Sequence, residues 1–176
     1  MKTLLKYSGI ISAVLAIVAF ILLLATPGVS YKAESGLGEV TKNISGVACI
    51  FGGTDDKFAC TWAGLLAFIL ILVALVILIC AIVLPLLKVK SLDKFAGVLN
   101  LVAVVALILA GIFAFCIVAA FKAANGDASG EITIAGYKVA KATYSIGAGW
   151  VIAGILSIVA GVFAVLPAAS DFISRK

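Results

Sequence analysis

The four cysteines are the residues whose positions say most about possible chemistry. Cys49 and Cys60 stand on either side of the polar segment 52–56, so segments 47–51 and 57–61 have the layout of a β-hairpin. If this loop faces an oxidising exterior, we predict a disulfide between Cys49 and Cys60, with two free thiols as the alternative. A metal site would need two more ligands, and the chain has no histidine to supply them. Cys80 and Cys116 fall towards opposite ends of two apolar runs, and we interpret them as small apolar fillers.

Groups suited to catalysis are missing from the apolar runs. There is no histidine, every acidic residue lies in a loop or terminus, and no lysine or arginine interrupts an apolar run. Ion-coupled transport and voltage sensing normally need such groups at membrane depth, so both are disfavoured. Ser12 and Asn100 are the clearest polar residues within these runs, and we expect them to make interhelical hydrogen bonds, with permeation or binding as the alternative. We therefore predict no enzymatic activity, no cofactor and no metal.

The composition indicates an integral membrane protein. Hydrophobic residues make up 65% of the chain, charged residues 12%, and the mean hydropathy is +1.33. Soluble proteins carry about 25% charged residues, so we expect a lipid bilayer as partner and no nucleic acid, despite the net charge of +5. We predict an all-α membrane protein, a four-transmembrane-helix bundle that forms a single domain over residues 1–176. The predicted spans are about 8–26, 62–87, 95–121 and 146–169, joined by outer loops 27–61 and 122–145 and inner loop 88–94.

The basic residues predict the orientation. Those that lie close to span ends on one side are Lys2, Lys6, Lys88, Lys90, Lys94, Arg175 and Lys176. Basic residues close to span ends favour the cytoplasmic side, so we place both termini and the inner loop in the cytoplasm and the protein in the plasma membrane. Trp62 and Trp150 then fall at the outer interface, where aromatic anchors are expected.

The second outer loop carries a strand signal. Residues 131–134 alternate between polar and apolar types, and Ala135-Gly136 can turn the chain back into 137–139. This pattern predicts a short strand pair. Together with the hairpin around the first cysteine pair, it predicts a small extracellular β-sheet built from the two outer loops.

Small residues recur at helical spacing within the spans. The fourth span has Gly149, Ala153, Ser157 and Gly161, the third has Ala106, Ala110 and Ala114, the first has Ser8, Ser12 and Ala16, and the second has Ala67, Ala74 and Ala81. Such faces allow helices to approach closely. We interpret them as packing surfaces inside one bundle, with an interface between copies as the alternative.

An internal duplication is a further hypothesis. Aligning the second half of the chain with the first places Lys6 over Lys94 and Trp62 over Trp150. Each half would then be a span, an outer loop and a span. The loops themselves do not match in sequence.

The Cys49 and Cys60 pair, the unequal loops and the strand-like segment 131–139 resemble the claudin and peripheral-myelin-protein type of tetraspan. In those proteins a disulfide hairpin precedes the second span and the second loop adds a strand. The family's Trp and Gly-Leu-Trp signature before the first cysteine is missing here. The resemblance implies a small outer sheet on a left-handed four-helix bundle that works through contacts with neighbours.

These expectations favour a non-enzymatic membrane protein that acts through its outer loops and helix faces. Self-assembly, adhesion and service as an accessory subunit of a membrane complex all fit, and the partner is a second copy or another membrane protein. The alternative is an oligomeric pore or transporter subunit, with Ser12 and Asn100 on a polar face between copies.

Overall fold

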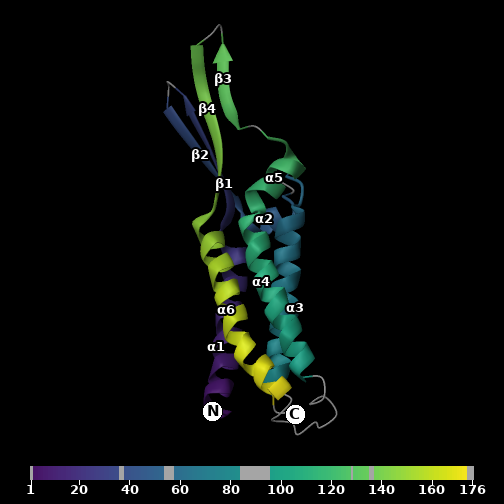
Figure 1. Ribbon diagram of the computed structural model, residues 1–176. Helices are drawn as coiled ribbons and strands as arrows, with labels where there is room; N and C mark the ends of the chain where they lie inside the picture. Colours follow the sequence, from purple (N-terminus) through teal and green to yellow (C-terminus); the bar gives the residue numbers. More distant parts are fainter. Residues whose placement is uncertain are drawn as a thin grey trace.

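The computed structural model describes residues 2–35, 38–53, 58–83, 96–127, 129–134 and 137–173. A bundle of long helices carries an antiparallel sheet that projects from one end (Figure 1). Along the chain the elements are α1 (Lys2–Ala25), β1 (Pro27–Ser35), β2 (Gly38–Ser45), α2 (Gly46–Phe51), α3 (Trp62–Val83), α4 (Ala96–Phe115), α5 (Ile117–Asn125), β3 (Gly130–Ile134), β4 (Tyr137–Ile146) and α6 (Ala148–Ile173). The predicted inner loop 88–94 lies outside the described residues.

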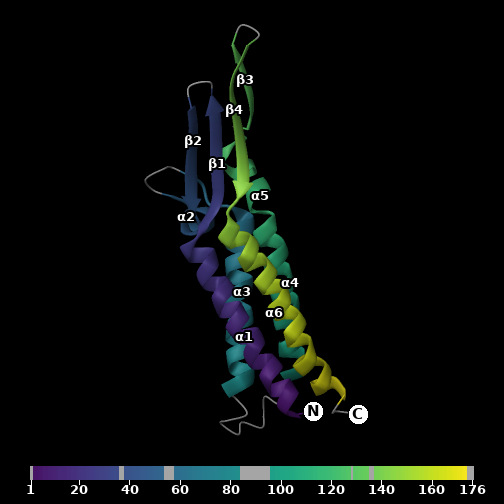
Figure 2. The same ribbon diagram turned by 90° about the vertical axis from the view of Figure 1, so that its left-hand side faces the viewer.

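Helices α1, α3, α4 and α6 form the bundle. Both α1 and α4 pack against α3 and against α6, so each helix has two principal neighbours. The first residues of α1 and the last residues of α6 lie at the end opposite the sheet (Figures 1 and 2). The other end, at Ala25, Trp62 and Ala148, is called the sheet end below. There α5 continues α4 beyond an irregular turn at Cys116.

The four predicted spans are confirmed as long apolar helices. The stretches long and apolar enough to cross a membrane are Tyr7–Ala25, Trp62–Val83, Gly97–Phe115 and Ala148–Ala169. Each is close to the roughly 20 residues that a helix needs to cross a bilayer. The four stretches therefore indicate a multi-pass membrane protein.

Side chains in the bundle are sorted by size rather than by polarity. Its interior is built largely from alanine, at Ala13, Ala16, Ala19, Ala67, Ala74, Ala103, Ala106, Ala110, Ala114, Ala153, Ala160 and Ala164. Large apolar side chains such as Val76, Val105, Ile155 and Val162 are exposed on the outward faces. A soluble bundle would bury such side chains. In a bilayer, lipid surrounds them instead, and small residues inside let the helices pack closely.

The projecting sheet has the strand order β2-β1-β4-β3, and all neighbouring strands are antiparallel. The predicted strand pair in the second loop is confirmed as β3 and β4. The β1–β2 hairpin was not predicted, and it stands in the sheet in place of the hairpin that was expected around the cysteines. Each of the two central strands is directly connected to a bundle helix, because β1 follows α1 after Thr26 and β4 precedes α6 by Gly147.

Two sequence-based interpretations of the loops need correction. Segment 47–51 was predicted as a hairpin arm, but it belongs to helix α2. Of the predicted turn, residues 54–56 lie outside the described residues, and Gly53 forms an antiparallel bridge with Phe58. The helix forms because Ser45 caps its first turn and Gly52 ends it with a φ of 86°. The duplication alignment also fails outside the spans, since it places β1 over residues 115–123, which are helical in α4 and α5.

Candidate functional site

The sheet presents one polar face, formed by alternate residues of three strands. Residues paired across antiparallel strands point to the same side. Register pairs Ser30 of β1 with Asn43 and Ser145, and Lys32 with Thr41 and Thr143. In the next row Glu34 is paired with Glu39 and Lys141. All of these residues are exposed except Ser30, which is half-buried.

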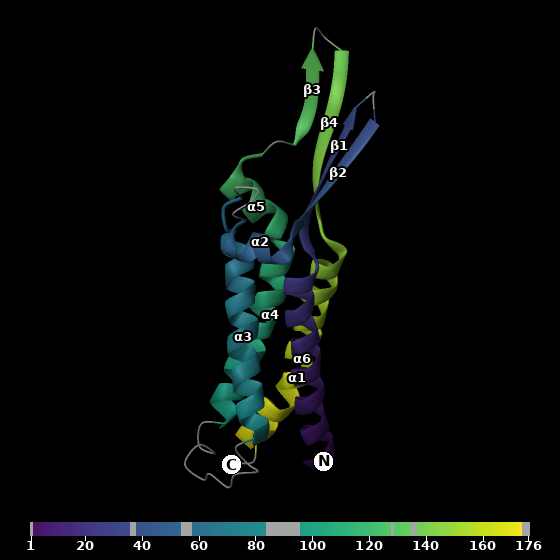
Figure 3. The same ribbon diagram turned by 180° about the vertical axis from the view of Figure 1, so that it is seen from behind.

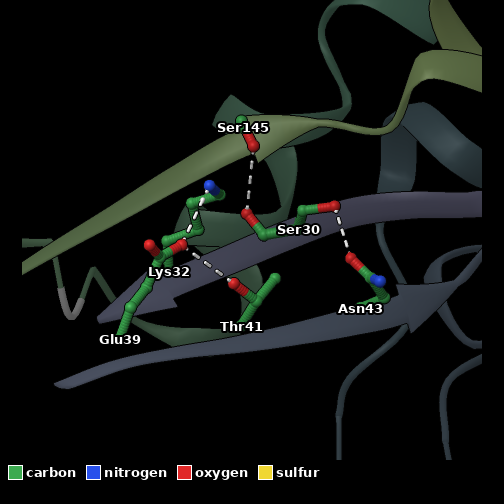
Figure 4. Close-up of polar contacts among 6 residues, drawn as sticks. All are labelled: Ser30, Lys32, Glu39, Thr41, Asn43 and Ser145. Atoms are coloured by element: carbon green, nitrogen blue, oxygen red, sulfur yellow. Dashed lines mark hydrogen bonds and ion pairs between the residues drawn. The ribbon is translucent and has the colours of Figure 1, made fainter. Parts of the chain in front are cut away.

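Hydrogen bonds order this polar face (Figure 4). The Ser30 hydroxyl donates to Asn43 Oδ1 at 2.8 Å, and the Ser145 hydroxyl donates to the Ser30 carbonyl at 3.4 Å. Lys32 Nζ lies 3.0 Å from Glu39 Oε1. The hydrogen bond and charge of Lys32 hold the pKa of the Glu39 carboxyl below its usual value, and Glu39 in turn raises the pKa of Lys32.

The opposite face of the sheet rests on α5 through aromatic rings. Tyr31 and Tyr144 are paired across β1 and β4 with ring centroids 5.0 Å apart, and Tyr144 lies 5.9 Å from Phe121 of α5. Phe58 lies 5.4 Å from Phe121. Lys122 Nζ lies 5.5 Å from the Tyr144 ring centroid. The face with these rings is thus covered near the bundle, and the polar face points the other way.

At the junction between α1 and the sheet, the last carbonyl groups of the helix accept hydrogen bonds from other donors. In a continuing helix the Leu23 carbonyl would accept from the amide of residue 27, but Pro27 has no N–H. The indole Nε1 of Trp150 donates to it instead, at 3.1 Å. The Thr26 hydroxyl donates to the Leu22 carbonyl at 2.6 Å, and the Thr26 carbonyl accepts from the Gly46 amide at 2.9 Å.

Thr61 and Asn125 join the connecting segments to the helices. Thr61 is buried, and both its hydroxyl (2.7 Å) and its amide (2.9 Å) donate to the Cys49 carbonyl. The Thr61 hydroxyl also accepts from the Gly64 amide at 3.2 Å and so acts as the N-cap of α3. The Asn125 side chain accepts from the Ala59 amide at 2.7 Å and donates to the Ala59 carbonyl at 3.3 Å. Sequence reasoning did not single out either residue, although a Thr directly before an apolar run is a recognisable N-cap signal.

Glycines allow the backbones of the junction to meet. A methyl group on Gly46 would overlap the Leu23 carbonyl oxygen, and one on Gly147 would overlap that of Pro27. At Gly28 it would lie 2.8 Å from the sulfur of Cys49. The sheet is therefore seated directly on the helix ends, with no room between them for a side chain.

The structure shows no disulfide between Cys49 and Cys60, and both are free. Cys49 is buried on the inner side of α2, with its sulfur beside Gly28, whereas Cys60 is exposed. Burial raises the pKa of the Cys49 thiol to about 11. Cys80 is exposed on α3 and Cys116 is half-buried.

The two tryptophans differ in role. Trp62 begins α3 and is 51% exposed, which agrees with an interface anchor. Trp150 is fully buried at 0% exposure, so it is a packing residue rather than the interface anchor that was predicted. Ser12 and Asn100 are also buried, and the Ser12 hydroxyl donates to the Ala160 carbonyl at 2.7 Å, which joins α1 to α6 as expected.

The predicted small-residue faces lie within the bundle. Ala106, Ala110, Ala114, Ala153, Ser157 and Gly161 are buried, and Gly149 is half-buried against Thr26. A methyl group on Gly161 would lie 3.3 Å from the Val104 carbonyl oxygen of α4. Ser157 donates to the Ala153 carbonyl of its own helix at 2.8 Å. These residues are thus used in packing α6 against its neighbours in one chain.

Among the described residues no group of three or more His, Cys, Asp or Glu side chains is placed to hold a metal ion. The arrangement defines a class: a bundle of four helices, each long and apolar enough to span a membrane, that carries a small antiparallel sheet, which is compatible with a tetraspan fold. Comparison of the chain with models of known protein families and with curated protein sequences gives no match.

Proposed function

We propose that this protein is a non-enzymatic, multi-pass protein of the cell membrane whose sheet is a contact surface for self-assembly, adhesion or attachment to a partner membrane protein. The polar face of the sheet is the observation that carries the proposal. Hydrogen bonds join its side chains (Figure 4), and the face is exposed and lies opposite the aromatic rings that contact α5. The adjoining edge strand β2 is exposed at seven of its eight positions, Ile44 being the buried one. Such an edge offers unpaired backbone groups to another chain.

The proposed orientation places the sheet outside the cell and both termini in the cytoplasm. The lysines near the termini and in the inner loop support it, because basic residues next to span ends favour the cytoplasmic side. The first residues of α1 and the last of α6 lie together at the end opposite the sheet (Figure 2), which a chain with four spans requires. The relation to claudin-type tetraspans is also part of this proposal. The topology and the outer sheet support it, and a disulfide does not.

Site-specific photocrosslinking in native membranes tests the contact function. A photoreactive residue at Thr41 or at Thr143 sits in the middle row of the polar face, and one at the exposed Val162 of α6 is the matched control on a lipid-facing helix. We expect protein adducts from the two sheet positions and not from the control. Co-expression of a second copy with a different tag shows whether the adduct is a self-contact. Absence of protein adducts at both sheet positions would overturn the proposal.

The pore alternative is less well supported. It relied on Ser12 and Asn100 lying on a polar face between copies, and both side chains are buried within this chain. The Ser12 hydroxyl is already bonded to the Ala160 carbonyl. The outward faces of the four bundle helices carry mainly large apolar side chains among the described residues. We therefore retain the contact function as the proposal.

A further inference from the structure

We propose that α2 is an interfacial helix whose outward side chains, Val47 and Phe51, insert into the acyl-chain region of the leaflet at the sheet end. The partner is the lipid itself, so the inference does not depend on what the sheet contacts. The six residues of α2 form two faces. Gly46, Cys49 and Ile50 are buried against the bundle, whereas Val47 is 46% exposed and Phe51 is 55% exposed. The outward face is apolar. Its two side chains are four residues apart in sequence, which places them next to each other on one side of a helix.

The position of α2 is fixed at both ends. Its first amide, from Gly46, donates to the carbonyl of Thr26 at the end of α1 at 2.9 Å. The Ser45 hydroxyl accepts from the Ala48 amide at 3.2 Å, and the Gly52 amide donates to the Ala48 carbonyl at 2.9 Å. Figure 3 shows the helix lying crosswise at the sheet end, beside α1 and α3. The outward face of α2 therefore has a defined depth relative to these helices.

Aromatic contacts give that depth. The Phe51 ring lies 5.2 Å from the ring of Phe68 on α3, and Phe68 lies 5.3 Å from Phe20 on α1. At a rise of ~1.5 Å per residue, Phe20 is about 7 Å before Ala25, and Phe68 is about 9 Å beyond Trp62. Phe51 thus contacts α3 in its second turn from the sheet end, through the same Phe68 ring that stacks on Phe20 of α1.

The length of α1 places this level inside the hydrocarbon core. Its apolar stretch, Tyr7–Ala25, has 19 residues. At ~1.5 Å per residue it covers about 28 Å, against a hydrocarbon thickness of ~30 Å, so the whole stretch is needed to cross. The boundary then lies near Ala25 and Phe51 lies several ångströms inside it. Interfacial helices bury their apolar faces ~5–10 Å into this region.

The sequence around α2 agrees with this placement. From Ile44 to Gly53 there is no charged residue, so no ionised side chain opposes insertion. In the turns of α1 and α3 near the sheet end, Ile21, Leu66 and Ile69 are also apolar and exposed. Val47 and Phe51 thus extend the lipid-facing surface of the bundle over the base of the sheet.

Fluorescence quenching in reconstituted vesicles tests the proposal with the full chain. The parent carries Trp62→Phe, which leaves the buried Trp150 as its tryptophan background. Phe51→Trp and Val47→Trp each add one reporter on the outward face of α2. Val40→Trp, at a position 66% exposed on β2, is the matched control within the sheet. Vesicles are made of phosphatidylcholine brominated on its acyl chains, and iodide in the buffer reports access from water.

We expect bromine to quench the reporters at positions 47 and 51 strongly while iodide does not, with the reverse result for Val40→Trp. Iodide quenching at both α2 positions would overturn the proposal, because it places the helix in water. Loss of both kinds of quenching would also overturn it, and disulfide crosslinking between copies carrying Phe51→Cys would then identify a second chain as the cover. Far-ultraviolet circular dichroism of each variant, compared with that of the parent, shows that the reporters leave the helices intact.

Discussion

Replacing Trp150 with phenylalanine is expected to destabilise the folded protein by about 2–5 kcal/mol. The indole is fully buried, and its Nε1 donates to the Leu23 carbonyl at 3.1 Å. Because Pro27 has no amide hydrogen, the chain offers that carbonyl no ordinary helical donor. The variant therefore removes a hydrogen bond and leaves a buried acceptor unpaired.

The magnitude has two parts. An unsatisfied buried acceptor costs ~1–3 kcal/mol, because the carbonyl has lost its hydrogen bond to water and gains no other. The space left by the smaller ring costs a further ~1–2 kcal/mol, since neighbours in a packed interior relax only in part. Trp62→Phe is the matched control. Trp62 is half exposed at the first residue of α3, and we expect its replacement to cost at most about 0.5 kcal/mol.

The assay is reversible unfolding in mixed micelles, followed by far-ultraviolet circular dichroism so that loss of a tryptophan does not alter the signal. The parent, Trp150→Phe and Trp62→Phe are compared under the same conditions. If Trp150→Phe unfolds within about 0.5 kcal/mol of Trp62→Phe, the reasoning about the Leu23 carbonyl is refuted.

Four further predictions concern the junction, the thiols and the segment that Asn125 holds. Gly46→Ala should cost about 2–4 kcal/mol of unfolding free energy in the same assay, because its methyl group overlaps the Leu23 carbonyl. Gly9→Ala has open space around it and should stabilise α1 by about 0.5–1 kcal/mol. Equal effects of the two substitutions would contradict the close approach at Gly46. A membrane-impermeant maleimide at pH 8 should label the exposed Cys60 and not Cys49, whose pKa is raised to about 11 by burial; rapid labelling of both would contradict this. Because that pKa is raised only in the folded state, the contribution of Cys49 to stability is full below its ordinary pKa of 9.0 and is lost as the pH rises through about 11, so the unfolding free energy of the parent should fall more over this range than that of Cys49→Ala. Asn125→Ala should speed hydrogen exchange at the Ala59 amide, with little change in the bundle, and unchanged exchange there would show that the side chain does not hold this segment.

The spans could be predicted because their signal is length and composition, which packing does not alter. The strands β3 and β4 followed from alternation of polar and apolar residues and a glycine turn. Alternation of apolar and polar residues also runs through β1, from Val29 to Ala33. In β2 three polar residues, Thr41, Lys42 and Asn43, separate Val40 from Ile44, so the sequence carries a strand signal for β1 and a weaker one for its partner β2.

Other features depend on contacts that a single sequence does not reveal. Segment 47–51 suits either a strand or a helix by composition, and the choice follows from Ser45 and Gly52 at its ends and from burial against the bundle. Cys49 is buried because it lies on the inner side of α2, whereas Cys60 is exposed. Trp150 is buried against the end of α1, where its Nε1 donates to the Leu23 carbonyl, a contact between distant parts of the chain. The polar face of the sheet required the β1–β4 register, which joins the two halves of the chain.

The direct passage of β1 into α1 and of β4 into α6 has a mechanical consequence. Thr26 and Gly147 are the single residues between the central strands and these helices, and both are held by hydrogen bonds to neighbouring segments. A pulling force on the outer part of the sheet would thus travel along the backbone into two helices that pack against each other. Tension at the polar face would be borne by α1 and α6 together, and a tilt of the sheet would turn this helix pair as one unit.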